Sequence, residues 1–436
     1  MKILVLTNHL ALFGGSEIVT LEVAEVFSKI GCDVSIYSAY IDDPMRSYMD
    51  ELEIKYSSFE NCPSPENFDI IWSQHHLLPC LLAKHGTSSI ENVFVVNASL
   101  SPYEPLEIPG AVAAVADMIV ANSRETADRL IDLGVTAEKI SVFYNAAPDS
   151  FNITRKARPN LKRALIISNH MPEELAQAAD VLRSRSIAVD HIGLPSRQKK
   201  ITSEIITSYD AVISIGKTVQ YSLLCETPVY VYDHFGGPGW LTEANFAEAE
   251  NFNFSGRCCR RQLLPEEIAD ELIGSYSEAA SAIRALKRAY SAKYTLRNYL
   301  TQIIECTSRR TNKERKRLID PNASNLIQRE GLLSGHLITL YQVAKHQSNE
   351  IAELTSNIDN LTSELSNSLD SILRMREERQ DLICSHEEFY DSQRQKINEK
   401  EQTIYRLEKK LSIMESSTSW KLTQPLRVIK RLISRQ

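Results

Sequence analysis

The segment Phe13-Gly14-Gly15-Ser16-Glu17 has the composition of an anion-binding turn. It follows an apolar run and opens a stretch of helical periodicity. Glycines let the backbone approach a ligand closely, and the first N–H groups of a helix favour anions. Gly14 and Gly15 are therefore candidate phosphate-binding residues. The spacing is not GxGxxG, so a dinucleotide site gets little support. A tight turn with no ligand is the alternative.

A second segment of this kind is Gly216-Lys217-Thr218, which follows the apolar run 211–215. Here a fixed positive charge stands beside the start of a predicted helix, which is suited to a diphosphate. The segment is not a P-loop, because the upstream glycine of GxxxxGK[ST] is replaced by Ala211. Gly216, Lys217 and Thr218 are therefore candidates for a diphosphate cradle.

The elements that would position these turns are apolar runs alternating with helical patterns over residues 1–158. Strands are predicted at Ile3–Leu6, Val34–Tyr37, Ile70–Trp72, Val93–Val96, Met118–Val120 and Val142–Tyr144, and helices at Ile18–Ile30 and Arg124–Leu133. Such alternation is typical of βαβ units in a parallel sheet.

The same pattern restarts over residues 159–307, after a polar stretch. Strands are predicted at Ala164–Ile167, Ala188–Ile192, Ala211–Ile215 and Val229–Tyr232, and helices continue from Pro265 to about Glu305. We therefore expect an α/β protein with two Rossmann-like lobes. Its ligand site should lie in the cleft between them, beyond the carboxyl ends of the strands. The neighbouring His75 and His76 follow a predicted strand and should lie at the mouth of this cleft, although a histidine there is often only a hydrogen-bonding structural residue.

Residues 308–344 are predicted to form a basic linker and a helix, and residues 345–415 a coiled coil. The apolar a and d positions are Ile351, Leu354, Ile358, Leu361, Leu365, Ile372 and Met375, with an offset series at Ile397, Ile404, Leu407, Leu411 and Met414. This spacing favours a homo-oligomer joined through the coiled coil, or assembly with a membrane-associated partner. A single amphipathic helix packed on the globular part is the alternative.

The last segment, residues 416–436, is a basic amphipathic tail. Trp420 stands beside a stretch with five Lys or Arg and no acids from Lys421 onward. Such a segment can lie on an anionic membrane surface, and it can equally be a solvated tail or a docking segment for another protein.

Composition limits the classes of function. A net charge of −7 argues against nonspecific nucleic-acid binding by the whole chain. No apolar window is long enough for a membrane span and no leader pattern opens the sequence, so a cytoplasmic location is expected. The eight cysteines include no CxxC pair, so we expect reduced thiols and no metal site.

One long segment carries a family resemblance. Residues 120–151, VANSRETADRLIDLGVTAEKISVFYNAAPDSF, resemble the end of the N-terminal lobe of retaining GT-B glycosyltransferases, and the upstream GGSE looks like that family's glycine loop. The resemblance covers roughly residues 1–305. It implies transfer of a sugar from a nucleoside diphosphate donor, with retention of configuration, and no cofactor or metal.

The resemblance also implies roles for individual residues. Residues 225–239 look like the family stretch whose turn faces the donor sugar. The donor-binding candidates are Gly14, Gly15, Asn169, His170, Gly216, Lys217, Thr218, Tyr221, Gly236 and Gly237, and the catalytic or acceptor-side candidates are His75, His76 and Asn97.

The chain departs from the family at several of these places. The places of two family glutamates are taken by Ser214 and Tyr221, and the Arg and Lys after the second lobe's first strand are absent. A histidine expected after the strand at Val93–Val96 is replaced by Asn97. These changes leave open a catalytically inactive scaffold or glycan-binding subunit, and a sugar-nucleotide epimerase of the same fold is a further alternative.

The ending SxSWKLTQPLR, at residues 417–427, resembles endings of bacterial enzymes of surface-polysaccharide and O-antigen assembly. It implies a cell-surface glycan or lipid-linked acceptor, and an enzyme that works at the inner face of the cell membrane.

Overall fold

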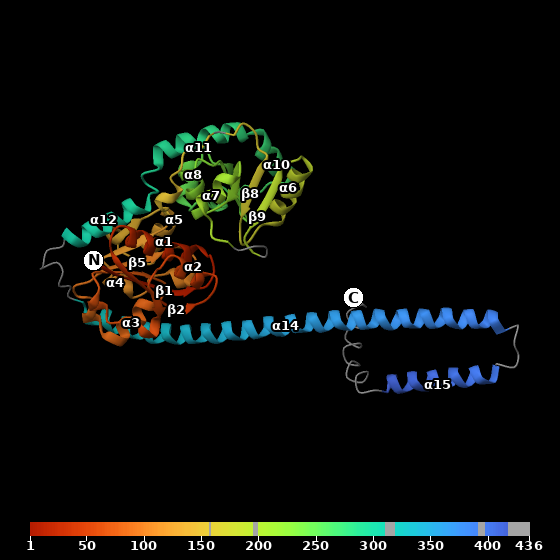
Figure 1. Ribbon diagram of the computed structural model, residues 1–436. Helices are drawn as coiled ribbons and strands as arrows, with labels where there is room; N and C mark the ends of the chain where they lie inside the picture. Colours follow the sequence, from red (N-terminus) through yellow and green to blue (C-terminus); the bar gives the residue numbers. More distant parts are fainter. Residues whose placement is uncertain (157, 195–198, 310–318, 391–396, 417–436) are drawn as a thin grey trace. The chain divides into compact units, whose positions relative to one another are not determined.

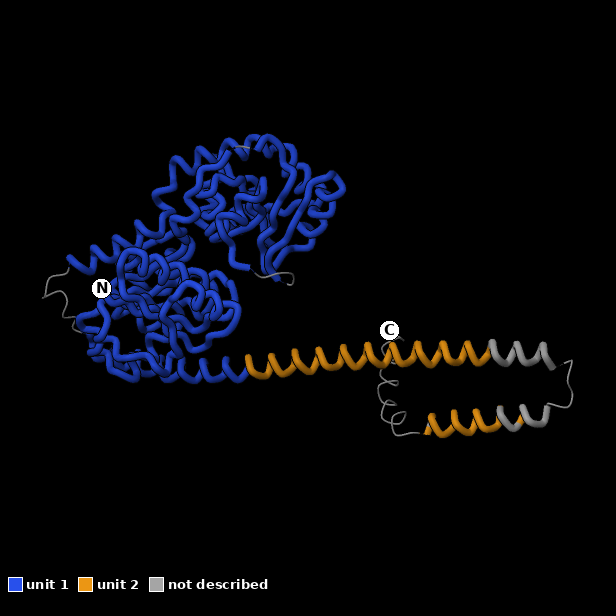
Figure 2. The backbone as a smooth tube through the Cα atoms, in the orientation of Figure 1, with its two compact units in different colours: residues 1–344 blue, residues 345–436 orange. Residues whose placement is uncertain are grey.

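The computed structural model describes residues 1–156, 158–194, 199–309, 319–390 and 397–416. The chain divides into two compact units, Met1–Ala344 and Lys345–Gln436 (Figure 2). Both predicted lobes lie in the first unit, and the first lobe precedes the second along the chain (Figure 1).

The first lobe is built on a parallel sheet of seven strands in the order β3-β2-β1-β4-β5-β6-β7. Its strands are β1 (Lys2–Leu10), β2 (Asp33–Ile41), β3 (Tyr56–Ser58), β4 (Ile70–Gln74), β5 (Phe94–Ser99), β6 (Met118–Ala121) and β7 (Ile140–Val142). Its helices are α1 (Gly15–Lys29), α2 (Met45–Glu51), α3 (Leu77–His85), α4 (Val112–Val115) and α5 (Arg124–Asp132).

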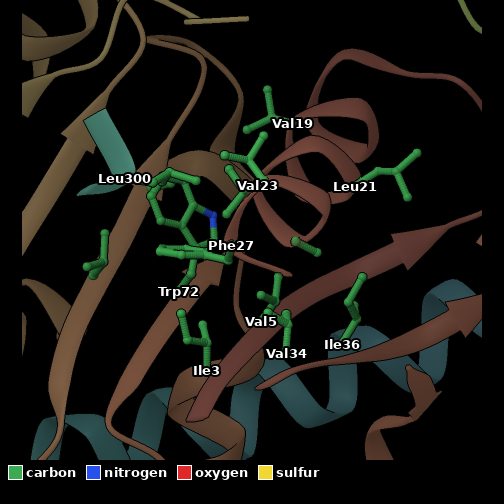
Figure 3. Close-up of a cluster of buried hydrophobic side chains, with 14 of the residues drawn as sticks. Ile3, Val5, Val19, Leu21, Val23, Phe27, Val34, Ile36, Trp72 and Leu300 are labelled. Atoms are coloured by element: carbon green, nitrogen blue, oxygen red, sulfur yellow. The ribbon is translucent and has the colours of Figure 1, made fainter. Parts of the chain in front are cut away.

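Both faces of this sheet are buried, which explains why β1 is apolar without alternation. Ile3 and Val5 pack with Phe27 of α1 in one cluster, which Figure 3 shows around Trp72. Leu4 belongs to a second cluster, on the other face, together with residues of α3 and α4. The strand ends are thereby fixed at one edge of a rigid layer.

The second lobe has five strands in the order β12-β11-β10-β8-β9. The strands are β8 (Arg163–Ile167), β9 (Ala188–Ile192), β10 (Ala211–Ser214), β11 (Val229–Asp233) and β12 (Gly236–Trp240), and only β12 is antiparallel to its neighbour. Its helices are α6 (Glu173–Ser184), α7 (Ser203–Ser208), α8 (Lys217–Leu224), α9 (Phe246–Asn251), α10 (Pro265–Gly274) and α11 (Tyr276–Tyr290), and α12 (Leu296–Arg309) follows them. The prediction of two Rossmann-like lobes is confirmed.

The chain passes between the lobes at two places that are hydrogen-bonded to each other. The Ala147 N–H donates to the Tyr294 carbonyl at 2.8 Å, and the Leu296 N–H donates to the Ala147 carbonyl at 2.9 Å. After the second passage α12 packs on the first lobe, where Leu300 lies against the cluster of Figure 3. Residues 296–307, which were expected to close the second lobe, thus pack against the first.

Three further details differ from the sequence prediction. Strands β3 and β12 were not predicted, and β7 ends at Val142 where a strand was expected to begin. Residues 321–344, within the segment predicted as a basic linker and a helix, begin α14 (Pro321–Tyr390) and pack on the first lobe through the fully buried Ile327.

The second unit contains the rest of α14 and α15 (Ile397–Glu415). Three of its heptad positions, Ile351, Leu354 and Ile358, are 63%, 61% and 60% exposed within the single chain. The coiled coil thus stays a prediction, and the tail at 417–436 lies outside the described residues. No helix in the described ranges combines the length and the hydropathy that crossing a membrane requires.

Candidate functional site

A cavity of about 550 Å³ lies where the carboxyl ends of both sheets meet. The first lobe lines it with the segments after β1, β5 and β6, and the second lobe with those after β8, β9, β10 and β11. The predicted site residues on its wall are Gly14, Gly15, Asn169, His170, Gly216, Lys217, Thr218 and Tyr221. The prediction that ligand-binding residues gather at the strand ends between the lobes is consistent with this placement.

The turn before α1 is held by a carboxylate. Glu17 Oε1 accepts from the Ala11 and Leu12 N–H groups at 2.7 and 3.0 Å, and its Oε2 accepts from the Gly14 N–H at 3.0 Å. A Cβ added at Gly15 would have no atom within 4 Å, so the protein leaves space in front of this residue. The first N–H groups of α1 lack acceptors within the helix and lie on the cavity wall.

The turn before α8 also lies on the wall, in a conformation that favours glycine. Gly216 has φ +56° and precedes the first residue of the helix. Two helix amino ends, one from each lobe, therefore border the same cavity. Their combined partial positive charge is suited to an anion carrying several oxygens.

Lys217 has a partner that the sequence did not reveal. Its Nζ lies 2.8 Å from Glu22 Oε2 of α1, and the two side chains are 10% and 1% exposed. The same Nζ donates to the Ala146 carbonyl at 2.9 Å. The lysine charge is thus balanced inside the protein by a carboxylate of the other lobe, and its role in holding a diphosphate stays a prediction.

Tyr221 is also bound to Glu22. Its hydroxyl donates to Glu22 Oε1, and its ring stacks on Phe151 with centroids 3.9 Å apart. Burial, together with the adjacent Glu22 carboxylate, raises the pKa of Tyr221 well above its usual value. Tyr221 is therefore a hydrogen-bond donor fixed at the junction of the lobes rather than a mobile contact for a sugar.

In the second lobe, the segments after β8 and β9 are joined. Asn169 Oδ1 accepts from the Leu194 N–H at 3.2 Å, and the His170 N–H donates to Ser168 Oγ at 3.1 Å. Gly193 has φ +136°, and a Cβ there would lie 2.0 Å from the Ser168 carbonyl oxygen. Only glycine fits this close approach, which keeps the wall near His170 open.

Gly236 and Gly237 are not among the lining residues. They belong to β12, where a Cβ on Gly237 would lie 2.0 Å from the Val231 carbonyl oxygen. The part of this region that does line the cavity is residues 232–234. The expected turn that faces a ligand is therefore displaced toward Asp233, whose carboxylate accepts from Ser255 Oγ at 2.7 Å.

His75, His76 and Asn97 also lie off the cavity wall. His76 caps α3 and its Nε2 contacts the Pro105 carbonyl at 3.4 Å, while the 2% exposed Asn97 donates to the Ser73 carbonyl at 3.2 Å. Asn97 is thus held by a backbone carbonyl, and His76 by the Pro105 carbonyl together with Ser334 and Glu330 of α14. Neither His76 nor Asn97 lines the cavity, so neither is placed to contact a ligand there.

His75 is buried behind a carboxylate that does reach the cavity. Its Nδ1 accepts from the Asn8 N–H at 3.3 Å, which leaves the proton on Nε2. That nitrogen lies 3.2 Å from Glu107 Oε1, while Glu107 Oε2 accepts from the Leu100 N–H at 2.9 Å. Glu107 is 5% exposed and lines the cavity. Thus His75 positions a carboxylate at the site.

Several lining residues were missed by the sequence reasoning. Glu104 and Glu107 stand at the two ends of a single 3₁₀ turn after β5, which is too short to give a periodic pattern in the sequence. Gly193 could have been found, since a glycine directly after a parallel strand is a usual sign of close approach. No group of three His, Cys, Asp or Glu in the described ranges is arranged to hold a metal ion.

Comparison with known proteins defines the fold. No family model and no curated protein matches the sequence. Among solved structures, HepE of Anabaena in complex with UDP is 15% identical and has a TM-score of 0.50, with 71% of this chain and 100% of HepE covered. HepE in complex with UDP and glucose is 17% identical with a TM-score of 0.49, and 71% of this chain and 99% of HepE are covered. A glycosyltransferase from Rickettsia africae is 16% identical with a TM-score of 0.46, and 70% of this chain and 97% of that chain are covered.

The chain therefore has the two-lobed GT-B fold, as its residues 120–151 led us to expect. At this level of identity the likeness concerns the fold, and the activity has to be argued from the site itself.

Proposed function

We propose that this chain is a glycosyltransferase that moves a sugar from a nucleoside diphosphate donor to a cell-surface glycan or lipid-linked acceptor. The observation that carries the proposal is the pair of helix amino ends, before α1 and α8, which border one cavity from opposite lobes. The solved structures of the same fold that contain UDP or UDP-glucose support it.

The diphosphate is the leaving group in such a transfer, and negative charge grows on it as the bond to the sugar breaks. The N–H groups at Gly15 and after Gly216 are fixed before the reaction, so they stabilise that charge without reorganisation. This arrangement provides charge stabilisation without a metal ion, in line with a metal-independent enzyme.

The first lobe also supplies a carboxylate. Glu107 is held by His75 and by the Leu100 N–H, and it faces the cavity together with Glu104. A carboxylate in this position stabilises positive charge that develops on the donor sugar, or accepts the proton of the acceptor hydroxyl. Retention of configuration corresponds to the first role and inversion to the second.

The location and acceptor follow from the sequence ending. We place the enzyme in the cytoplasm at the inner face of the cell membrane, where a lipid-linked glycan of the O-antigen type would be its acceptor. The resemblance of residues 417–427 to bacterial surface-polysaccharide enzymes supports this placement.

A non-catalytic GT-B module is the second candidate, and one observation favours it. Glu22 engages both Lys217 and Tyr221, so two residues expected to contact the donor are used in joining the lobes. Such a module would bind a nucleotide or a glycan without turning it over.

The test is isothermal titration calorimetry with UDP, GDP, ADP and dTDP, followed by release of free nucleotide from the corresponding donors. We expect one nucleoside diphosphate to bind, and Gly15→Leu to weaken it about tenfold or more, because the added side chain fills the space in front of Gly15. Gly274→Leu is the matched control, since Gly274 is also free of neighbours but lies outside the cavity.

Two outcomes would contradict the proposal. Absence of binding by any of the four nucleotides would rule out a donor site. Binding with no turnover in the presence of membrane lipid extracts, together with equal behaviour of Glu107→Gln and wild type, would favour the non-catalytic module.

A further inference from the structure

Helix α14 carries a row of exposed leucines before it leaves the first unit. Leu333, Leu337 and Leu340 are 68%, 52% and 51% exposed. Large apolar side chains grouped in this way on a soluble protein usually mark a surface for a partner. The feature is separate from the cavity, and it does not depend on the proposed function.

These leucines stand in the same heptad frame as the predicted coiled coil. Leu340 and Leu354 are fourteen residues apart, as are Leu337 and Ile351, so no insertion or deletion breaks the frame between the two units. α14 is a single helix across this boundary. The apolar seam therefore begins about two heptads earlier than Ile351, inside the unit that holds the cavity.

The face of α14 next to this row of leucines is already occupied. Ile327 is fully buried against the first lobe, and Ser334 is 2% exposed. A Cβ on Gly331 would lie 2.5 Å from the Pro79 carbonyl oxygen of α3, so the two helices are in close contact there. The first lobe thus fixes this segment through the adjacent heptad positions b and e, and it leaves the leucines at a and d more than half exposed.

We propose that α14 binds α14 of a second copy of this chain along a parallel, two-stranded seam that runs from Leu333 to Met375. A helix with exposed apolar residues at heptad positions a and d packs against another helix that has the same repeat. A second copy of this chain provides such a helix. In the regular part of the seam, Ile351 and Ile358 occupy a while Leu354 and Leu361 occupy d, a choice that favours two parallel strands.

The charged positions that flank the seam agree with a parallel pair. Glu350, Glu364 and Glu378 all occupy g. A parallel pair places g beside e of the next heptad, so that Glu350 meets Thr355 and Glu364 meets Leu369 of the second copy. An antiparallel pair centred on Glu364 would instead place glutamates beside glutamates.

The seam also contains positions that set its register. Gln347 and Ser368 both stand at d, where a polar side chain is stabilised only opposite the equivalent polar residue of the second copy. Any shift by one heptad would put each of them against an apolar side chain. The two copies are therefore aligned in register, with equal residues side by side.

Sedimentation equilibrium of the full chain at micromolar concentration tests the proposal. We expect twice the chain mass of 49.3 kDa. Leu340→Glu places a charge in the seam of both copies and should weaken association roughly 100-fold or more. Leu332→Glu is the matched control: Leu332 lies about two turns earlier on the same helix, is 74% exposed and stands at position c, so the variant should leave the mass unchanged.

Each further outcome decides one part of the proposal. A monomeric wild type would overturn it, and so would a trimer or tetramer. Loss of the dimer in Ile358→Glu but not in Leu340→Glu would confine the seam to the second unit and refute its extension into the first.

Orientation requires a separate measurement. A photo-crosslinking amino acid at Leu340, in a mixture of ¹⁴N- and ¹⁵N-labelled chains, should give mixed-isotope peptides joined near residue 340 in both copies. Crosslinks from residue 340 to the region of residues 361–375 would show an antiparallel pair and overturn the proposal. Unchanged thermal unfolding of each variant shows that the helix still packs on the first lobe.

Discussion

The contact between Glu22, Lys217 and Tyr221 predicts a strong coupling between the lobes. Glu22→Gln keeps the shape of the side chain and an acceptor for the Tyr221 hydroxyl, but it leaves the buried Lys217 ammonium without its counter-charge. Removing one partner of a buried ion pair costs about 3–5 kcal/mol. Two carbonyl acceptors, of Asn145 and Ala146, remain on Lys217, so the lower end of this range is expected.

The expected change can be measured as a shift of the melting temperature. For the first unit, residues 1–344, an unfolding entropy of roughly 2.1 cal/mol/K per residue gives about 0.7 kcal/mol per kelvin. A loss of about 3 kcal/mol therefore lowers the midpoint by about 4 °C. Lys217→Met should have a similar effect, because it strands the Glu22 carboxylate in the same place.

The decisive measurement is a double-mutant cycle by urea unfolding. With both charges removed, Glu22→Gln/Lys217→Met should recover at least about 1.5 kcal/mol relative to the sum of the single losses. Lys29→Met, which breaks an exposed pair on the same helix, should change stability by about 0.5 kcal/mol or less. If the stability losses of the two single variants sum to the loss of the double variant within about 0.5 kcal/mol, the coupling is refuted.

Two other positions give clear expectations. Gly193→Ala forces a Cβ to 2.0 Å from the Ser168 carbonyl oxygen at φ +136°, so we expect a loss of roughly 3 kcal/mol or more in urea unfolding, whereas Gly274→Ala should be neutral or slightly stabilising. A wild-type midpoint for Gly193→Ala would contradict the packing described. At Asp210, burial would raise the pKa, but hydrogen bonds from Arg158 and from two backbone N–H groups lower it overall. This carboxylate therefore stabilises the fold above about pH 4, and the contribution disappears as the pH falls through the lowered pKa. Asp210→Asn should cost about 1.5–3 kcal/mol at pH 7 and progressively less below pH 4, and a difference that persists unchanged in acid would contradict this assignment.

The fold could be predicted where burial leaves a local mark in the sequence. Strands such as β1 and β11 are covered on both faces, and their apolar runs are unbroken. β12 was missed because Gly236–Trp240 contains three glycines and a proline, a composition that otherwise indicates a turn. β3 is a three-residue, half-exposed strand with two serines at the sheet edge, and its pairing with β2 gives no pattern of its own.

The residues of the candidate site could likewise be predicted only where a local segment of the sequence indicates them. The turns at Gly14 and Gly216 were predicted as phosphate-binding candidates from their own glycine content and position before a helix, and both line the cavity. The pairing of Lys217 with Glu22 joins residues from different lobes, so nothing in either segment indicates it. Glu107 owes its position to His75, which lies on a different strand end, and only the folded chain brings the two together.

The two passages between the lobes have a mechanical consequence. Because the backbone at Ala147 is hydrogen-bonded on one side to Tyr294 and on the other to Leu296, both passages lie on one short line. Torsion about that line changes few dihedral angles, whereas sliding one lobe across the other would break these bonds. Rotation about that line would change the width of the cavity and the angle between the sheets together, and the Lys217–Glu22 ion pair, which also joins the lobes, would oppose it.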